Sequence, residues 1–160
     1  MPSKRNRQRR AAEGALPTTL RAIGYATPDH AIPIDLGLLT HEERHRPVRE
    51  LTLVHGDTVA IDFPTGAIED GCLLELDSGR CVEILASDEC LYEVRGTDRE
   101  HLWQLRAYLL TRYTEIQFED DRLLFPRDPA ARKALERREA KVSEVCEPFF
   151  PTSPEPAQPT

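Results

Sequence analysis

The chain has 160 residues, of which 39% are hydrophobic and 6% aromatic, and a formal net charge of −7. This length allows one domain or two very small ones, and it excludes multidomain enzymes and barrels of about 250 residues. The charge is uneven, because residues 1–10 carry five cations and no acid. The body that follows is therefore acidic and should repel nucleic acid.

Residues 1–17 are basic and lack a hydrophobic period, which predicts a disordered arm. No aromatic residue lies between the cations, so we expect an electrostatic tail and no nucleic-acid binding. Prolines crowd residues 151–160, which predicts a solvated tail.

No stretch approaches the roughly 18 apolar residues of a membrane span. Glu13 and Pro17 interrupt any secretory signal that the basic start could begin. The four cysteines include no Cys-x-x-Cys pair and are interpreted as reduced thiols. We therefore expect a cytoplasmic protein that does not bind membranes.

The first half of the chain, residues 18–87, alternates short aliphatic runs with turn residues. This pattern predicts a small β domain containing two hairpins. The expected strand pairs are Val48–Val54 with Thr58–Phe63 around His55-Gly56-Asp57, and Cys72–Leu76 with Arg80–Leu85 around Asp77-Ser78-Gly79.

The second half, residues 88–150, changes period between strand-like and helix-like segments. Thr97-x-x-Glu100 is typical of a capping box, and Asp128-Pro129 predicts an N-cap and a proline in the first helical turn. The expected elements are strand Leu91–Arg95, a helix with Leu102, Leu105 and Leu109, strands Thr114–Glu119 and Arg122–Phe125, a helix to about Glu139, and strand Lys141–Cys146. The order β-α-β-β-α-β predicts a ferredoxin-like domain, and hence an α+β protein.

The stretch His41-Glu42-Glu43-Arg44-His45 matches the zincin pattern, in which two histidines on a helix bind zinc and the glutamate activates water. This keeps a zinc metalloprotease open as an alternative. Pro47 and Gly37 flank the stretch between expected strands. We therefore predict a polar turn in which His41 and His45 share no helical face. No Ser-His-Asp or phosphate-binding glycine-rich pattern is present, so no catalytic or cofactor-binding residue is predicted.

Several motifs in chain order carry a family resemblance. The stretch Leu39–Arg46, which includes Glu-Glu-Arg-His-Arg, and Gln117-x-x-x-Asp-Arg-Leu are the most specific. The others are Val59–Gly66, Asp70-Gly71, the Asp77–Arg80 hairpin, Leu91–Arg95 and Glu147-Pro148-Phe149. Together they span about residues 18–150 and resemble urease accessory proteins of the UreE type.

This resemblance implies a homodimeric nickel chaperone and not an enzyme. Its N-terminal β domain would contact partners, and its ferredoxin-like domain would handle metal. The implied partners are the urease apoprotein and the accessory GTPase UreG, and the implied cargo is nickel.

The sequence departs from the family pattern at both aligned metal-binding histidines. Tyr113 stands at the position of the histidine that closes the family's first helix, and Pro129 at that of a second histidine opening the last helix. Nickel favours imidazole and thiolate ligands, and a phenol with a pKa of about 10 is protonated at neutral pH. We therefore assign no metal ligand. A divergent interaction scaffold that binds no nickel remains the alternative.

Overall fold

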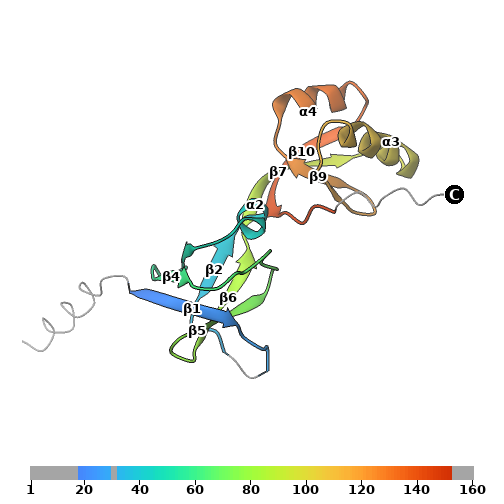
Figure 1. Ribbon diagram of the computed structural model, residues 1–160. Helices are drawn as coiled ribbons and strands as arrows, with labels where there is room; N and C mark the ends of the chain where they lie inside the picture. Colours follow the sequence, from blue (N-terminus) through green and yellow to red (C-terminus); the bar gives the residue numbers. More distant parts are fainter. Residues whose placement is uncertain (1–17, 30–31, 153–160) are drawn as a thin grey trace, which may run out of the picture. The chain divides into compact units, whose positions relative to one another are not determined.

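The computed structural model describes residues 18–29 and 32–152, and its elements form the predicted α+β arrangement (Figure 1). Within these ranges the strands form a six-stranded and a four-stranded sheet. The chain divides into two compact units. Among the described residues, the N-terminal unit comprises 18–29, 32–38 and 44–85, and the C-terminal unit comprises 39–43 and 86–152.

The six-stranded sheet has the spatial order β2-β6-β5-β1-β4-β3. Its strands are β1 (Thr19–Tyr25), β2 (Leu36–Leu39), β3 (Glu50–Thr52), β4 (Thr58–Ile61), β5 (Cys72–Leu76) and β6 (Cys81–Ala86). β1 pairs in parallel with β4 and antiparallel with β5, so it lies at the centre of the sheet.

Both hairpins predicted from turn residues are confirmed. β3 pairs antiparallel with β4, and β5 pairs antiparallel with β6, where Leu74 lies opposite Val82. Gly56 and Gly79 adopt φ angles of 100° and 85° in the two turns, a region that other residues rarely occupy. The turns thus set a register in which the opposed aliphatic side chains are buried.

The zincin-like stretch is a short helix, α2 (His41–His45), so the prediction of a polar turn is wrong. Its two histidines, four residues apart, lie on one side of the helix, contrary to our expectation. The missed signal is a capping box. The Glu43 N–H donates to Thr40 Oγ1 (3.3 Å), and the Thr40 N–H donates to Glu43 Oε2 (3.2 Å). Pro47 restricts only the residue before it, which already lies outside the helix.

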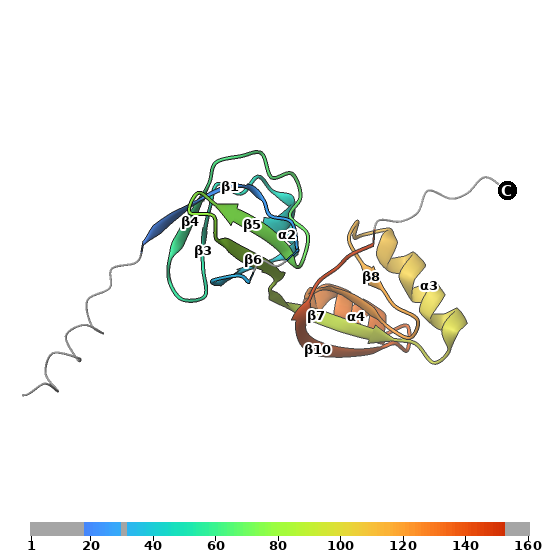
Figure 2. The same ribbon diagram turned by 90° about the horizontal axis from the view of Figure 1, so that it is seen from below.

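The C-terminal unit has the element order that the sequence predicts. Its elements are β7 (Asp88–Arg95), α3 (Arg99–Leu110), β8 (Gln117–Phe118), β9 (Leu123–Pro126), α4 (Pro129–Glu136) and β10 (Lys141–Pro148). Its antiparallel sheet has the order β10-β7-β9-β8, and the longest pairing joins β7 to β10 over eight residue pairs (Figure 2).

Helices α3 and α4 pack on the same face of this sheet (Figures 1 and 2). The core between them is built from Leu102, Leu105 and Leu109 of α3, Ala131 and Leu135 of α4, and Tyr92, Val94, Leu123, Phe125 and Val142 of the strands. The opposite face holds a smaller cluster of Leu91, Leu124 and Phe149. The leucine spacing that predicts α3 therefore reflects its buried side.

The helix caps agree with the sequence at α4 and differ at α3. Asp128 caps α4 with Pro129 following it, as predicted, although the helix ends at Glu136 and not near residue 139. The N-cap of α3 is Asp98, whose Oδ1 accepts from the His101 N–H at 2.7 Å. The sequence analysis placed this cap at Thr97, one residue earlier. That prediction is wrong, because the Thr97 backbone N–H donates to the His101 ring.

The predicted basic arm, residues 1–17, lies outside the described residues, as does the tail from residue 153 onward. In the part of the chain that the structure describes, no helix has the length and apolar character needed to cross a membrane.

The corrected cap gives a direct stability test. Asp98→Ala should lower the free energy of unfolding by about 1 kcal/mol, because it removes the side-chain acceptor from the first turn of α3. Thr97→Ala is the matched control and should cost less, because its backbone N–H still reaches the His101 ring. Urea denaturation measures both. An equal loss in the two variants would restore Thr97 as the cap.

Candidate functional site

Tyr113, which the sequence analysis aligned with a family histidine, lies just after α3 and makes its contacts within the C-terminal unit. Its N–H donates to the Leu109 carbonyl at 2.8 Å, and its ring packs on Phe125 with centroids 5.3 Å apart. Its hydroxyl donates to Asp128 Oδ2. Burial, and next the hydrogen bond to Asp128, raise the pKa of Tyr113 to about 12. The phenol therefore remains a neutral donor at physiological pH.

Asp128 connects the two aligned positions, because it precedes Pro129 and receives the Tyr113 hydroxyl. Its Oδ1 also accepts from the Ala130 N–H at 3.0 Å, which caps α4. These hydrogen bonds, that of the Tyr113 hydroxyl first, hold the pKa of Asp128 below its ordinary value. The structure thus brings the two sequence-predicted positions together, and the interaction there joins the end of α3 to the start of α4.

His41 is buried in the C-terminal unit, with 8% of its surface exposed. Its Nε2 lies 3.2 Å from Glu115 Oε1, and its ring meets the Phe149 ring edge-on with centroids 5.7 Å apart. Its backbone N–H donates to Glu89 Oε2 at 2.9 Å. A zincin site requires both helix histidines to turn a ring nitrogen toward one ion. The His41 nitrogen is directed to a carboxylate instead, which does not favour the metalloprotease hypothesis.

The remaining described histidines also make defined contacts. His55 Nδ1 lies 2.7 Å from Asp35 Oδ1. His101 accepts from the Thr97 N–H at Nδ1 (2.9 Å), and its Nε2 lies 2.8 Å from the Arg138 carbonyl. Among residues 18–29 and 32–152, no group of three or more His, Cys, Asp or Glu side chains is arranged to hold a metal ion.

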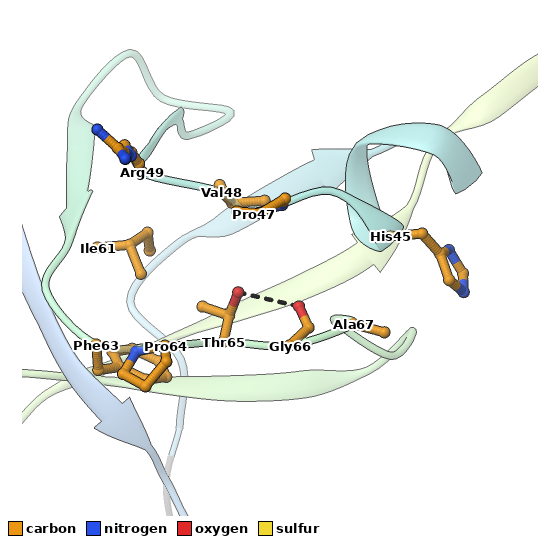
Figure 3. A pocket seen from close by; sticks show the side chains of 10 residues that line it. All are labelled: His45, Pro47, Val48, Arg49, Ile61, Phe63, Pro64, Thr65, Gly66 and Ala67. Atoms are coloured by element: carbon orange, nitrogen blue, oxygen red, sulfur yellow. Dashed lines mark hydrogen bonds between the residues drawn. The ribbon is translucent and has the colours of Figure 1, made fainter.

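The N-terminal unit contains an open pocket of about 590 Å³ (Figure 3). Pro47 and Val48 form one wall, and Phe63 to Gly66 form the other, while His45 and Arg49 stand at its two ends. The sequence analysis did not predict this pocket. Its walls come from loops about 15 residues apart in the chain, and no local pattern reports their approach.

Comparison with known proteins identifies the family. A family model described as "UreE urease accessory protein, N-terminal domain" matches residues 20–87. The chain is 38% identical over 125 residues to a urease accessory protein UreE of Sinorhizobium fredii, covering 78% of this chain and 79% of that protein. It is also 38% identical over 125 residues to the UreE of Rhizobium meliloti, with 78% and 81% covered. The UreE 1 of Brucella suis is 37% identical over 122 residues, with 76% and 75% covered.

The chain belongs to the UreE family of urease accessory proteins.

The UreE-like segment that ends in Asp-Arg-Leu has a structural role here. Arg122 donates to Glu119 (2.6 Å), Glu93 (2.9 Å) and Glu147 (2.7 Å), which lie on or beside three different strands. These carboxylates raise the pKa of Arg122, and the pKa of Glu93 is lowered, first by Arg95 and then by Arg122. Arg122 therefore offsets part of the negative charge of three partly buried carboxylates. The sequence alone did not show this purpose.

The Tyr113 contact can be tested through stability. Tyr113→Phe should lower the melting temperature by several degrees at pH 7, because it removes the donor to Asp128. The contact lowers the pKa of Asp128, so it stabilises the folded protein above the ordinary pKa of 3.8. This stabilisation is lost as the pH falls through the lowered pKa that Asp128 has in the folded protein. The gap to the wild type should therefore narrow toward pH 3. Calorimetry with Tyr108→Phe, a hydroxyl loss within α3, provides the control. A pH-independent gap would contradict this assignment.

Proposed function

We propose that this protein assists assembly of the nickel centre of urease by contacting partner proteins, and that it is a weak nickel binder. The family membership supports the assembly role. The observation that carries the second part is the hydrogen bond from Tyr113 to Asp128, at the position of a family metal ligand.

The chemistry of the site supports weak nickel binding. Nickel is the cargo of such a protein, and a donor site needs several nitrogen or sulfur ligands that converge. Tyr113 presents a protonated phenol whose pKa is about 12, and Pro129 has no side-chain ligand. The nearest carboxylate, Asp128, already accepts hydrogen bonds at both oxygens.

We further propose a division of labour between two domains. Residues 18–87 would form the partner-binding β domain, and residues 88–150 a ferredoxin-like domain. The spatial order β10-β7-β9-β8 and the β-α-β-β-α-β chain order support the second assignment. The partners proposed from the family are the urease apoprotein, the GTPase UreG and a second copy of the chain, acting in the cytoplasm. No catalytic step is assigned, in keeping with an accessory protein.

Nickel affinity tests the weak-binding part. Equilibrium dialysis at pH 7 should give a Kd in the tens of micromolar or weaker, about −6 kcal/mol. Tyr113→His should tighten binding, because it supplies an imidazole at the aligned position. Tyr108→His, which places an imidazole within α3 away from the aligned position, should leave the affinity unchanged. Submicromolar binding by the wild type would contradict the proposal, and His41, His45 and Cys146 would then be the first residues to replace.

Urease activation tests the assembly role. In cells that produce a urease and its other accessory proteins but lack this chain, we expect low urease activity, which the wild-type chain restores. A partner-contact role predicts that this requirement persists when nickel is added in excess. If excess nickel removes the requirement, the chain is a nickel donor. If its loss has no effect at any nickel concentration, the assembly role is wrong.

A further inference from the structure

Two cysteines face each other across the longest strand pairing of the C-terminal unit. Cys90 of β7 is the register partner of Cys146 of β10, and both side chains are exposed free thiols. Figure 2 shows these two strands side by side. We propose that Cys90 and Cys146 form a reversible redox site, which a small-molecule disulfide such as oxidised glutathione closes into a bond between β7 and β10.

The strand register supplies the geometry for this bond. Directly opposed residues of an antiparallel pair have Cα atoms about 4.5 to 5.5 Å apart. A disulfide requires Cα atoms about 4.4 to 6.8 Å apart. The register therefore places the two Cα atoms within the range that a disulfide spans, and seven further residue pairs hold the two strands in place on either side.

The surroundings of Cys146 are also ordered. Arg127 Nη2 lies 3.7 Å from its Sγ, and the same guanidinium donates to the carbonyls of Leu91 and Val145, both at 3.1 Å. A cation is thus anchored beside one sulfur by the two strands that the bond would join. Exposure gives a dissolved disulfide access to both thiols.

The other two cysteines lack these properties. Cys72 lies opposite Ile84, and Cys81 lies opposite Glu75, so the two are out of register in the β5–β6 hairpin. Cys81 is buried. Burial, followed by the charges of Glu69 and Asp70, raises the pKa of Cys72 to about 11, which suppresses its thiolate. They serve as internal controls.

The reaction proceeds by two thiol–disulfide exchanges. One cysteine thiolate attacks oxidised glutathione, so a mixed disulfide forms and one glutathione thiol leaves. The second cysteine thiolate then attacks the sulfur of the first cysteine in this mixed disulfide. The Cys90–Cys146 bond forms, and the second glutathione thiol leaves. The cysteine pair loses two electrons, oxidised glutathione is reduced by two, and the two cysteine protons pass to the released thiols.

The bond would fasten β10 to β7 and enclose α3, β8, β9 and α4 in one covalent loop. A cross-link that closes a long loop reduces the conformational freedom of the unfolded chain. We therefore expect the oxidised protein to melt several degrees higher and the amide protons of residues 141–147 to exchange more slowly.

The test oxidises the full chain with a glutathione buffer, blocks the remaining thiols and measures intact mass. Two of the four thiols should be protected. A protease that cleaves after glutamate separates Cys81 from Cys90 and should release peptide 90–93 joined to the peptide that begins at Val145. Cys90→Ser and Cys146→Ser should each abolish the link and the rise in melting temperature, whereas Cys72→Ser should keep both.

Stable glutathione adducts, disulfide-linked dimers, a link that involves Cys72 or Cys81, or four unprotected thiols would each overturn the proposal. A Cys90–Cys146 link that changes neither the melting temperature nor amide exchange in β10 would overturn its clamping role. Reduction with dithiothreitol should reverse every effect in the wild type, and a failure to reverse would contradict a reversible site.

Discussion

The antiparallel pairing of β7 with β10 is the interaction on which the C-terminal unit depends. It joins the first and last strands of the unit, which are about 50 residues apart in the chain, through eight opposed residue pairs. One face of this pair supports the core under α3 and α4, and the other face presents Glu93 and Glu147 to Arg122. The same register places Cys90 opposite Cys146.

The hydrogen bond from Tyr113 to Asp128 connects the two helices of the C-terminal unit. Tyr113 follows α3 and directs its hydroxyl to Asp128, the N-cap of α4. The contact satisfies a polar group and helps to hold the two helices, so the position contributes to stability.

Local signals predicted the two hairpins and the elements of the C-terminal unit, because hairpin turns, leucine spacing and the Asp128-Pro129 cap act within a few residues. They did not predict β1, the helix α2 or the cap of α3. At α2 the missed signal is the capping box of Thr40 and Glu43, and at α3 the Thr97 N–H donates to the His101 ring. In both places a side chain can hydrogen-bond to more than one neighbouring backbone group, and sequence spacing alone does not show which bond forms.

The sequence by itself determined the α+β class, the two hairpins, the order of elements in the C-terminal unit, and the family, because these follow from periodicity, turn chemistry and motifs along the chain. It also placed a tyrosine at position 113 and a proline at position 129, which we aligned with family histidines. Only the tertiary structure decided the partner of Tyr113, since Asp128 lies 15 residues away. Strand pairing and chain folding, which bring distant residues together, likewise decided three other features. These are the wall of the pocket near His45, the carboxylates around Arg122 and the pairing of Cys90 with Cys146.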